Sequence, residues 1–398
     1  MQAGHSSRRR TGAVIAGLAF GIIAAAPVGV HAQTDSAGYI TRLGTDTLAI
    51  ERFVRTPERV EAEVLLRIPS TTRTTYVMEL GSDGTLRRLE SHTFDPKQAG
   101  SEPVRRSIVE RTGDSLRIRT TMRGETREQT VAAPAATLPF IDMVHWPYEI
   151  ALIRARAASV DVVQQPLLSG SRTSNFAFGR VGADSMTITH PSRGTMRVRV
   201  DADGRLLGLD AGATTRKLIV TREPWMPIEG YAERWAALDA AGKSLGALSG
   251  RGETKATVAG ANILVDFGTP AKRGREIWGK LVPYGEVWRT GANQATHFTT
   301  DRDLVLGTGT DTLRVPAGQY TLFSVPAADG GVLIVNRQTG ITGTAHNPAH
   351  DLGRVRMTPG PLSDPVEVFD IAVTPGGDGG AIRLRWDEME MVVPFVVR

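Results

Sequence analysis

The sequence predicts a mainly β protein in two parts: an N-terminal antiparallel curved sheet or half-barrel with one helix, and a C-terminal antiparallel β-sandwich. Apolar and polar residues alternate strictly in several segments, which is typical of strands with one buried and one solvated face. Asp-Gly pairs stand between such segments, where hairpin turns need residues that accept positive φ. Few segments have helical periodicity, so strands supply most of the predicted fold.

The N-terminal segment predicts export. Arg8–Arg10 form a basic cluster, residues 13–26 form an uncharged and mostly apolar run, and Val30 and Ala32 stand at the two positions that a signal peptidase reads. The apolar run is too short for a bilayer span, which needs about 20 residues. We therefore expect a signal peptide over residues 1–32 and a periplasmic or secreted protein. A retained N-terminal anchor helix is the alternative.

Composition limits the classes of partner. None of the 398 residues is cysteine, which excludes disulfides, thiolate zinc sites and a cysteine nucleophile. The net charge of +5 falls to +2 without residues 1–32, because that segment holds three arginines and no acids. Other basic residues alternate along strand-like segments, so we expect no nucleic-acid partner. With 41% hydrophobic residues the composition is globular, and we expect no transmembrane span after signal cleavage.

Residues 35–222 form the predicted N-terminal domain. Alternation is clearest at residues 116–122 and 196–200, and the second segment leads through Asp203-Gly204 into another apolar strand. An open, curved sheet wrapped around one helix satisfies this order of elements. In general layout it resembles periplasmic lipid-carrier and lipoprotein-chaperone half-barrels, and this resemblance implies an apolar or lipid-like ligand.

The helix of this domain is expected at about residues 147–158. A proline suits its first position, Glu149 favours the positive N-terminal end, and two arginines favour the negative C-terminal end. Ile150, Ile153 and Ala157 form the expected apolar stripe.

Residues 223–250 form the predicted linker, because prolines and glycines accumulate there. A second short helix is expected within it at residues 231–238, which places Tyr231, Trp235 and Leu238 on one face. The boundary between the two domains is expected in this segment.

Residues 251–398 form the predicted C-terminal β-sandwich domain. Trp386 lies on the apolar face of an alternating strand, so we expect it in the core. The long motif at residues 263–293, with further segments at 315–326 and 333–336, resembles a bacterial family catalogued as domain of unknown function 2911. The resemblance implies an exported, all-β bacterial module whose biochemical role is not established.

The hexapeptide Trp-Arg-Thr-Gly-Ala-Asn at residues 288–293 is the densest chemical cluster in the sequence. Gly291 and Asn293 tolerate left-handed backbone, which predicts a tight turn that leads into a strand at residues 295–300. Arg289 offers five donors in a rigid fork that suits a carboxylate or a phosphate.

Two interpretations of this cluster remain open. In one, Arg289 and Asn293 bind an anion or a sugar between Tyr284 and Trp288. In the other, Arg289 is buried and ties turns to the sheet through an ion pair with Asp266, Glu276 or Glu286. The sequence favours the ion pair over the ligand site.

The histidines add weaker candidates. His297 and Glu286 form a candidate acid/base pair, although a lone strand histidine is more often structural. His346, His350 and Asp351 are ligands of the kind that zinc uses. A proline between the two histidines disrupts a helix, so exposed histidines at an Asn-Pro turn are the favoured interpretation and no metal is expected.

Familiar catalytic motifs are incomplete in the sequence or lack the structural context that they need. Residues 241–244 imitate the end of a phosphate loop, but Ala237 stands where the first glycine is needed. Gly307-Thr-Gly309 lacks the third glycine of a dinucleotide-binding turn. The Gly-x-Ser-x-Gly spacing occurs at Gly242–Gly246, but this segment is part of the predicted linker and lacks the strand–turn–helix context that a nucleophile elbow needs. We therefore expect no cofactor and do not predict an enzyme.

The leading hypothesis is an exported bacterial envelope protein that binds without catalysis. Its ligand is expected to be an apolar, glycan or anionic small molecule, or its partner another envelope protein. One alternative is a hydrolase or lyase with a His/Glu/Arg site in the C-terminal domain. The other is a purely structural module in which Arg289 is scaffold.

Overall fold

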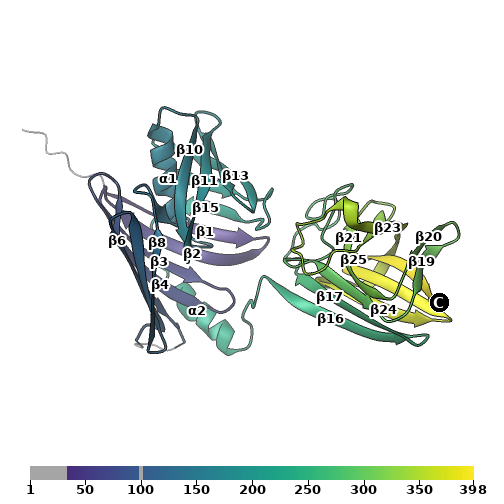
Figure 1. The fold of residues 1–398 in the computed structure, drawn as a ribbon. Helices are drawn as coiled ribbons and strands as arrows, with labels where there is room; N and C mark the ends of the chain where they lie inside the picture. Colours follow the sequence, from purple (N-terminus) through teal and green to yellow (C-terminus); the bar gives the residue numbers. More distant parts are fainter. Residues whose placement is uncertain (1–33, 98–101) are drawn as a thin grey trace, which may run out of the picture. The chain divides into compact units, whose positions relative to one another are not determined.

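A computed structural model describes residues 34–97 and 102–398 (Figure 1). The expected signal peptide, residues 1–32 with Arg8–Arg10, lies outside the described residues. Within the described part of the chain, no helix has both the length and the apolar character that a membrane span requires. The described residues from Thr34 onward form one compact unit.

The N-terminal part is a single sheet of fifteen strands. Two meanders, β1–β8 and β9–β15, meet where β1 pairs with β15, and each neighbouring pair is antiparallel except β9 with β10. β8 also contacts β11, so the sheet curves back toward itself without closing into a barrel. The strands of the first meander are β1 (Asp35–Leu43), β2 (Asp46–Arg55), β3 (Arg59–Leu66), β4 (Thr72–Leu80), β5 (Leu86–Phe94), β6 (Arg105–Thr112), β7 (Ser115–Met122) and β8 (Glu125–Ala132). Those of the second are β9 (Leu138–Pro139), β10 (Val162–Ser169), β11 (Arg172–Arg180), β12 (Ser185–His190), β13 (Gly194–Val200), β14 (Leu206–Asp210) and β15 (Ile219–Glu223).

The alternating segments form strands with one buried face, as predicted. In β7, Leu116 and Ile118 are buried while Arg117 and Arg119 are exposed. The Asp-Gly pairs lie in hairpin turns, and their glycines have the positive φ that these turns need, 77° at Gly84 and 87° at the glycine between β13 and β14.

Helix α1 (Trp146–Ala157) confirms the predicted helix within one residue. The expected apolar stripe is only partly right, because Ala157 is exposed and Ile153 is half-buried. α1 contacts β9, β10, β11 and β14 on one face of the sheet, so it is enclosed on several sides. Its buried residues are therefore Trp146, Pro147, Tyr148, Glu149, Ile150, Ala151, Leu152 and Ala155.

Two buried carboxylates attach α1 to the sheet. Glu51 of β2 accepts hydrogen bonds from the backbone N–H groups of His145 (2.8 Å) and Trp146 (3.2 Å), which are free donors at a helix N-terminus. Glu149 accepts from the Tyr39 hydroxyl at 2.5 Å and pairs with Arg222. Burial raises the pKa of Glu149, and Arg222 opposes that rise. Glu149 was expected only to favour the helix N-terminus, and its ion pair is an additional role.

Helix α2 (Glu229–Ala240) lies within the segment that was expected to be the linker. Ile228, Ala232 and Trp235 pack with Ile50 and Leu65 of the sheet. Ile50 alternates with Glu51 along β2, so α2 covers the face of the sheet opposite to α1. The expected helix at residues 231–238 falls inside α2.

The C-terminal part consists of two antiparallel sheets, as the sandwich prediction requires. One has the order β16-β17-β18-β21-β22-β23 and the other β20-β19-β25-β24. Buried residues of both sheets form one apolar cluster, in which Ile382, Leu384 and Trp386 are at most 1% exposed, so the core position predicted for Trp386 is confirmed. The elements are β16 (Ser249–Val258), β17 (Ala261–Pro270), β18 (Thr296–Thr300), β19 (Leu304–Thr308), β20 (Asp311–Val315), β21 (Gly318–Val325), β22 (Val332–Asn336), the 3-10 turn η1 (Pro348–His350), β23 (Asp351–Arg356), β24 (Thr358–Gly376) and β25 (Gly379–Val397).

Candidate functional site

The hexapeptide at residues 288–293 forms the tight turn that the sequence predicts. Thr290, Gly291 and Asn293 have positive φ of 50°, 148° and 61°, and β18 begins at Thr296. The backbone of Trp288 exchanges two hydrogen bonds with Ser324 of β21, of 2.7 and 2.9 Å. These bonds attach the turn to the central strands of the six-stranded sheet.

Close backbone contact makes this turn rigid. A Cβ atom at Gly268 would lie 2.0 Å from the carbonyl oxygen of Ala292, so only glycine fits there. The buried Thr296 donates its hydroxyl to the carbonyl of Thr290 at 2.6 Å, and Thr290 donates its own to Ser324 at 3.0 Å. The side chain of Arg289 therefore starts from a fixed backbone.

A second loop covers the stem of Arg289. A Cβ atom at Gly343 would lie 2.5 Å from Cδ of Arg289 and 3.0 Å from the carbonyl oxygen of Asn293. The Gly343 N–H donates to that same carbonyl at 3.0 Å. The missing side chain at position 343 thus leaves the space in which Arg289 lies.

Arg289 is half-buried and has no counter-ion among the described residues. Within residues 34–97 and 102–398, no carboxylate oxygen lies within 4.0 Å of its guanidinium. Burial lowers the pKa of Arg289, and no neighbouring acid opposes that effect. The ion pair that the sequence favours does not form: Asp266 pairs with Arg251 at 2.5 Å, and Glu276 and Glu286 are exposed.

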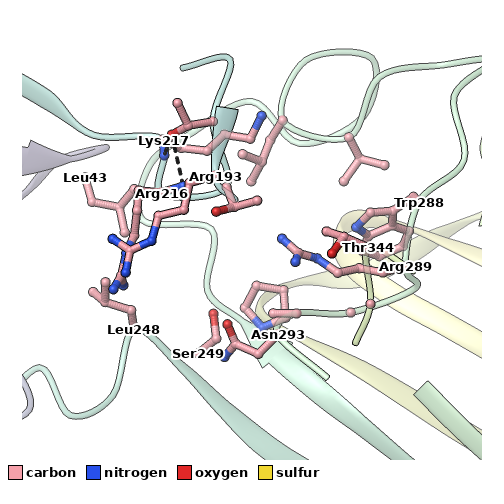
Figure 2. A pocket seen from close by; sticks show the side chains of 18 of the residues that line it. Leu43, Arg193, Arg216, Lys217, Leu248, Ser249, Trp288, Arg289, Asn293 and Thr344 are labelled. Carbon is pink, nitrogen blue, oxygen red and sulfur yellow. Dashed lines mark hydrogen bonds between the residues drawn. The ribbon is translucent and has the colours of Figure 1, made fainter. Parts of the chain in front are cut away.

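Arg289 lines a pocket of about 870 Å³. Figure 2 shows its guanidinium extending from the turn into this space, with Trp288, Asn293 and Thr344 beside it. The structure thus brings Arg289 and Asn293 together with Trp288 on one wall, and Glu286 also lies on the lining. Tyr284 was expected to form another wall, but it is 40% exposed and is not among the lining residues.

The pocket lining carries more cations than anions. Its acids are Asp142 and Glu286, and Asp142 is already paired with Arg193 and Arg216. Burial lowers the pKa of Lys217, and the positive charges of Arg275 and Arg289 add to that effect. The cationic lining residues are Arg193, Arg216, Lys217, Arg275 and Arg289.

The ring of Trp288 contacts the aromatic core. It stacks on Trp386 with ring centroids 6.1 Å apart and an interplanar angle of 15°. It also makes edge contacts with Trp278 and Phe369. These contacts fix the residue that precedes Arg289, so Trp288 positions the turn.

His297 and Glu286 do not form the acid/base pair considered from the sequence. Nε2 of His297 accepts a hydrogen bond from the Gly340 N–H at 3.0 Å, and Nδ1 lies 3.4 Å from Nη2 of Arg251. Burial, followed by the charge of Arg251, lowers the pKa of His297. His297 thus holds the loop after β22 and is not among the pocket-lining residues.

His346, His350 and Asp351 divide into a pair and an isolated residue. His346 Nε2 lies 2.9 Å from Oδ1 of Asp351, whereas His350 is exposed in η1. Within the ranges that the structure describes, no three His, Cys, Asp or Glu residues lie together so that they could hold a metal ion. His346 lines the pocket of Arg289.

The sequence did not predict that Gly343, Thr344 and His346 line the same pocket as Arg289. Gly343 lies far along the chain from Arg289, and the contact between them is set by the pairing of β18, β21 and β22. No local pattern in the sequence signals such a contact.

Comparison with known proteins identifies the C-terminal part. Residues 249–395 match the family model described as "Protein of unknown function (DUF2911)", which confirms the resemblance seen in the sequence. No curated protein matches the chain.

Solved structures that are similar to part of the chain include two at low identity. A crystal structure of a DUF1089 family protein from Pseudomonas aeruginosa is 14% identical, with 42% of this chain and 90% of that chain covered and a TM-score of 0.31. A β-barrel-like protein of domain of unknown function DUF1849 from Brucella abortus is 11% identical, with 48% of this chain and 94% of that chain covered and a TM-score of 0.32. Neither description gives a function.

Proposed function

Residues 249–395 are a domain of the DUF2911 family, whose role is not established, so we propose a function from the site itself. We propose that this protein binds a small anion at Arg289 without transforming it. The anionic group would be a carboxylate, phosphate or sulfate. One observation supports the proposal. The guanidinium of Arg289 is half-buried on the pocket wall and has no ion-pair partner among the residues that the structure describes.

Among the described residues, Arg289 has no counter-ion, and this favours anion binding energetically. Burying a charged group costs free energy unless hydrogen bonds or an opposite charge compensate for lost hydration. Arg251 has Asp266 for this purpose, and Arg275 donates to the backbone carbonyls of Lys272 and Ala271. Among the residues that the structure describes, Arg289 has neither kind of partner, so an anion from solution would supply one through the two parallel N–H donors of the guanidinium.

The position of Arg289 also supports a binding role. A scaffold arginine is expected to bond to the turns that it connects, but here the backbone bonds of Trp288 and the packing of Gly343 hold the turn without its guanidinium. Asn293 adds an amide group to the same wall. The purely structural alternative is therefore less well supported.

The N-terminal sheet has two hollows of about 390 and 450 Å³, but both are lined mainly by polar and charged side chains, so neither suits the apolar ligand considered from the sequence. A cavity inside it, lined by Phe140, Tyr148 and His190 among others, has a volume of about 30 Å³. That volume holds one or two water molecules. The proposed ligand is accordingly placed at Arg289.

The hydrolase or lyase alternative would need a base on the same wall as Arg289. Of the histidines named for that role, His346 lines the pocket, whereas His297 and His350 are not among the lining residues. A paired His and Asp beside an arginine suits proton transfer as well as binding. The half-buried guanidinium of Arg289, which has no counter-ion among the described residues, supports binding directly, so binding is the proposal.

Export to the periplasm or beyond remains part of the proposal. The basic cluster Arg8–Arg10 and the apolar run at residues 13–26 support it.

Sulfate binding to the full protein tests the anion site. Arg289→Gln should weaken sulfate binding by roughly ten- to a hundredfold, because hydrogen bonds to charged groups contribute about 1.5–3 kcal/mol. Arg289→Lys should bind more tightly than Arg289→Gln but less tightly than the unaltered protein, since lysine keeps the charge and loses the fork. Isothermal titration calorimetry at constant ionic strength measures all three affinities.

Arg251→Gln is the matched control, because Arg251 is a nearby arginine that already has a carboxylate partner. Its sulfate affinity should equal that of the unaltered protein. The proposal fails if Arg289→Gln binds sulfate normally and instead lowers the melting temperature by many degrees, which is the result for a scaffold residue.

A further inference from the structure

A chain of polar side chains holds His346 on the pocket wall. Asn336 of β22 is fully buried and donates its amide to Oδ1 of Asp351 at 2.8 Å. The same oxygen lies 2.9 Å from Nε2 of His346, and the side chains of His346 and Asp351 are only 14% and 12% exposed. The imidazole also packs against Phe323, with centroids 4.7 Å apart. His346 therefore has a defined orientation.

The carboxylate determines which ring nitrogen remains free. Burial alone would raise the pKa of Asp351, but the hydrogen bonds from Asn336 and His346 bring it below its ordinary value. Asp351 is thus ionised near neutral pH, and Nε2 of His346 donates to it. Within the described ranges Nδ1 of His346 has no hydrogen-bond partner, so it is the nitrogen left for a ligand.

The loop of His346 is tied to Arg289. The Gly343 N–H donates to Asn293, and Gly343 packs against the stem of Arg289. Phe323, which contacts the imidazole, precedes Ser324, which pairs with Trp288. His346 and Arg289 consequently line one pocket from two connected loops.

We infer that His346 is a second anion-binding residue of the Arg289 site, and that its imidazole takes up a proton when the anion binds. This inference rests on the function proposed above. A neutral imidazole that donates through Nε2 has a lone pair on Nδ1, which repels an anionic oxygen. A protonated imidazole presents an N–H donor and a positive charge, which attract it.

The surrounding charges favour this coupling. Asp351, with Arg354 bound to its other oxygen, faces the imidazole directly. Cations outnumber acids on the rest of the lining, so the pocket attracts an anion. A bound anion beside the imidazole would favour its charged form. The lining cations are Arg193, Arg216, Lys217, Arg275 and Arg289, and the acids are Asp142 and Glu286.

The test uses sulfate, whose charge does not change between pH 5.5 and 8. The affinity of the full protein for sulfate should rise about tenfold from pH 8 to pH 5.5, the effect of roughly one pKa unit of coupling. Titrations in two buffers of different ionisation enthalpy should show proton uptake on binding.

Variants separate His346 from other titrating groups. His346→Gln should bind sulfate at all pH values with the affinity that the unaltered protein has at pH 8. Asp351→Asn should shift the pH dependence to lower pH, because the imidazole loses its carboxylate. His350→Gln, which changes an exposed histidine four residues away, should keep the full pH dependence.

Each outcome decides between the claims. Sulfate binding without pH dependence, or an unchanged pH dependence in His346→Gln, overturns the inference and leaves the Arg289 site intact. Absence of sulfate binding at every pH overturns the proposed function itself. If His346→Gln is poorly folded by circular dichroism, Asp351→Asn and the proton count of the unaltered protein still decide the matter.

Discussion

Arg289 and Gly343 act together at the scale of single residues. The aliphatic part of the Arg289 side chain lies against the backbone of Gly343, which has no Cβ atom. A Cβ atom there would lie only 2.5 Å from Cδ of Arg289. The sequence identifies Arg289 and Asn293 as candidates because their chemistry is visible in the motif at residues 288–293. Whether Arg289 has a counter-ion depends on which acids the fold brings near it, and spacing along the chain does not contain that information.

Gly343→Ala should therefore weaken sulfate binding several-fold while the fold is retained. The new Cβ atom clashes with Cδ of Arg289 and approaches the carbonyl of Asn293, so Arg289 must leave its position. Titration calorimetry measures the affinity.

Gly376→Ala is its matched control, because a Cβ atom there meets nothing within 4 Å. It should bind sulfate normally. Equal affinities in the two variants would show that the position of Arg289 does not matter for the anion.

At the scale of elements, helix α1 shows what local pattern can and cannot predict. Its bounds agree with the prediction within one residue, because proline, acidic and basic residues mark its ends. The prediction of its buried face is wrong in part. The predicted apolar stripe assumes that one side of the helix is covered, whereas the curved sheet covers several sides. The carboxylate at its N-terminus comes from Glu51, 94 residues earlier in the chain, so no capping motif signals it.

Glu51→Ala should lower the free energy of unfolding by about 2–4 kcal/mol, because at least two buried N–H donors lose their acceptor. Glu51→Gln should cost less, since its amide oxygen still accepts one bond. Urea denaturation measures both.

Glu253→Ala provides the comparison, because Glu253 is a half-exposed strand residue that pairs with Lys255 on its own strand. A change of less than about 0.5 kcal/mol is expected there. A similar small effect in Glu51→Ala would mean that Glu51 does not stabilise the helix.

At the scale of the whole molecule, the described residues bury apolar side chains in separate clusters, of which the two largest belong to the N-terminal sheet and to the C-terminal sheets. Period-two alternation predicts most of this architecture because each strand needs only one buried face. The junction of β1 with β15 is not predictable in this way, since their pairing joins residues such as Gly38 and Glu223 from opposite ends of the domain.

The proposed export also concerns the whole chain. When the full chain is expressed in a bacterial host, the recovered protein should begin at Gln33, because Val30 and Ala32 suit signal peptidase. Intact mass spectrometry measures this. Ala32→Leu should block cleavage at that bond, and recovery of the unaltered protein beginning at Met1 would contradict export by cleavage.

We propose above all that Arg289 binds an anion. The effect of sulfate on the unfolding midpoint tests this proposal most directly. Sulfate should raise the unfolding midpoint of the unaltered protein relative to chloride at equal ionic strength, because it binds only the folded state. Arg289→Gln should lose this rise and be at least as stable as the unaltered protein without sulfate. An equal sulfate-dependent rise in both proteins, or marked destabilisation of Arg289→Gln in chloride, would contradict the claim.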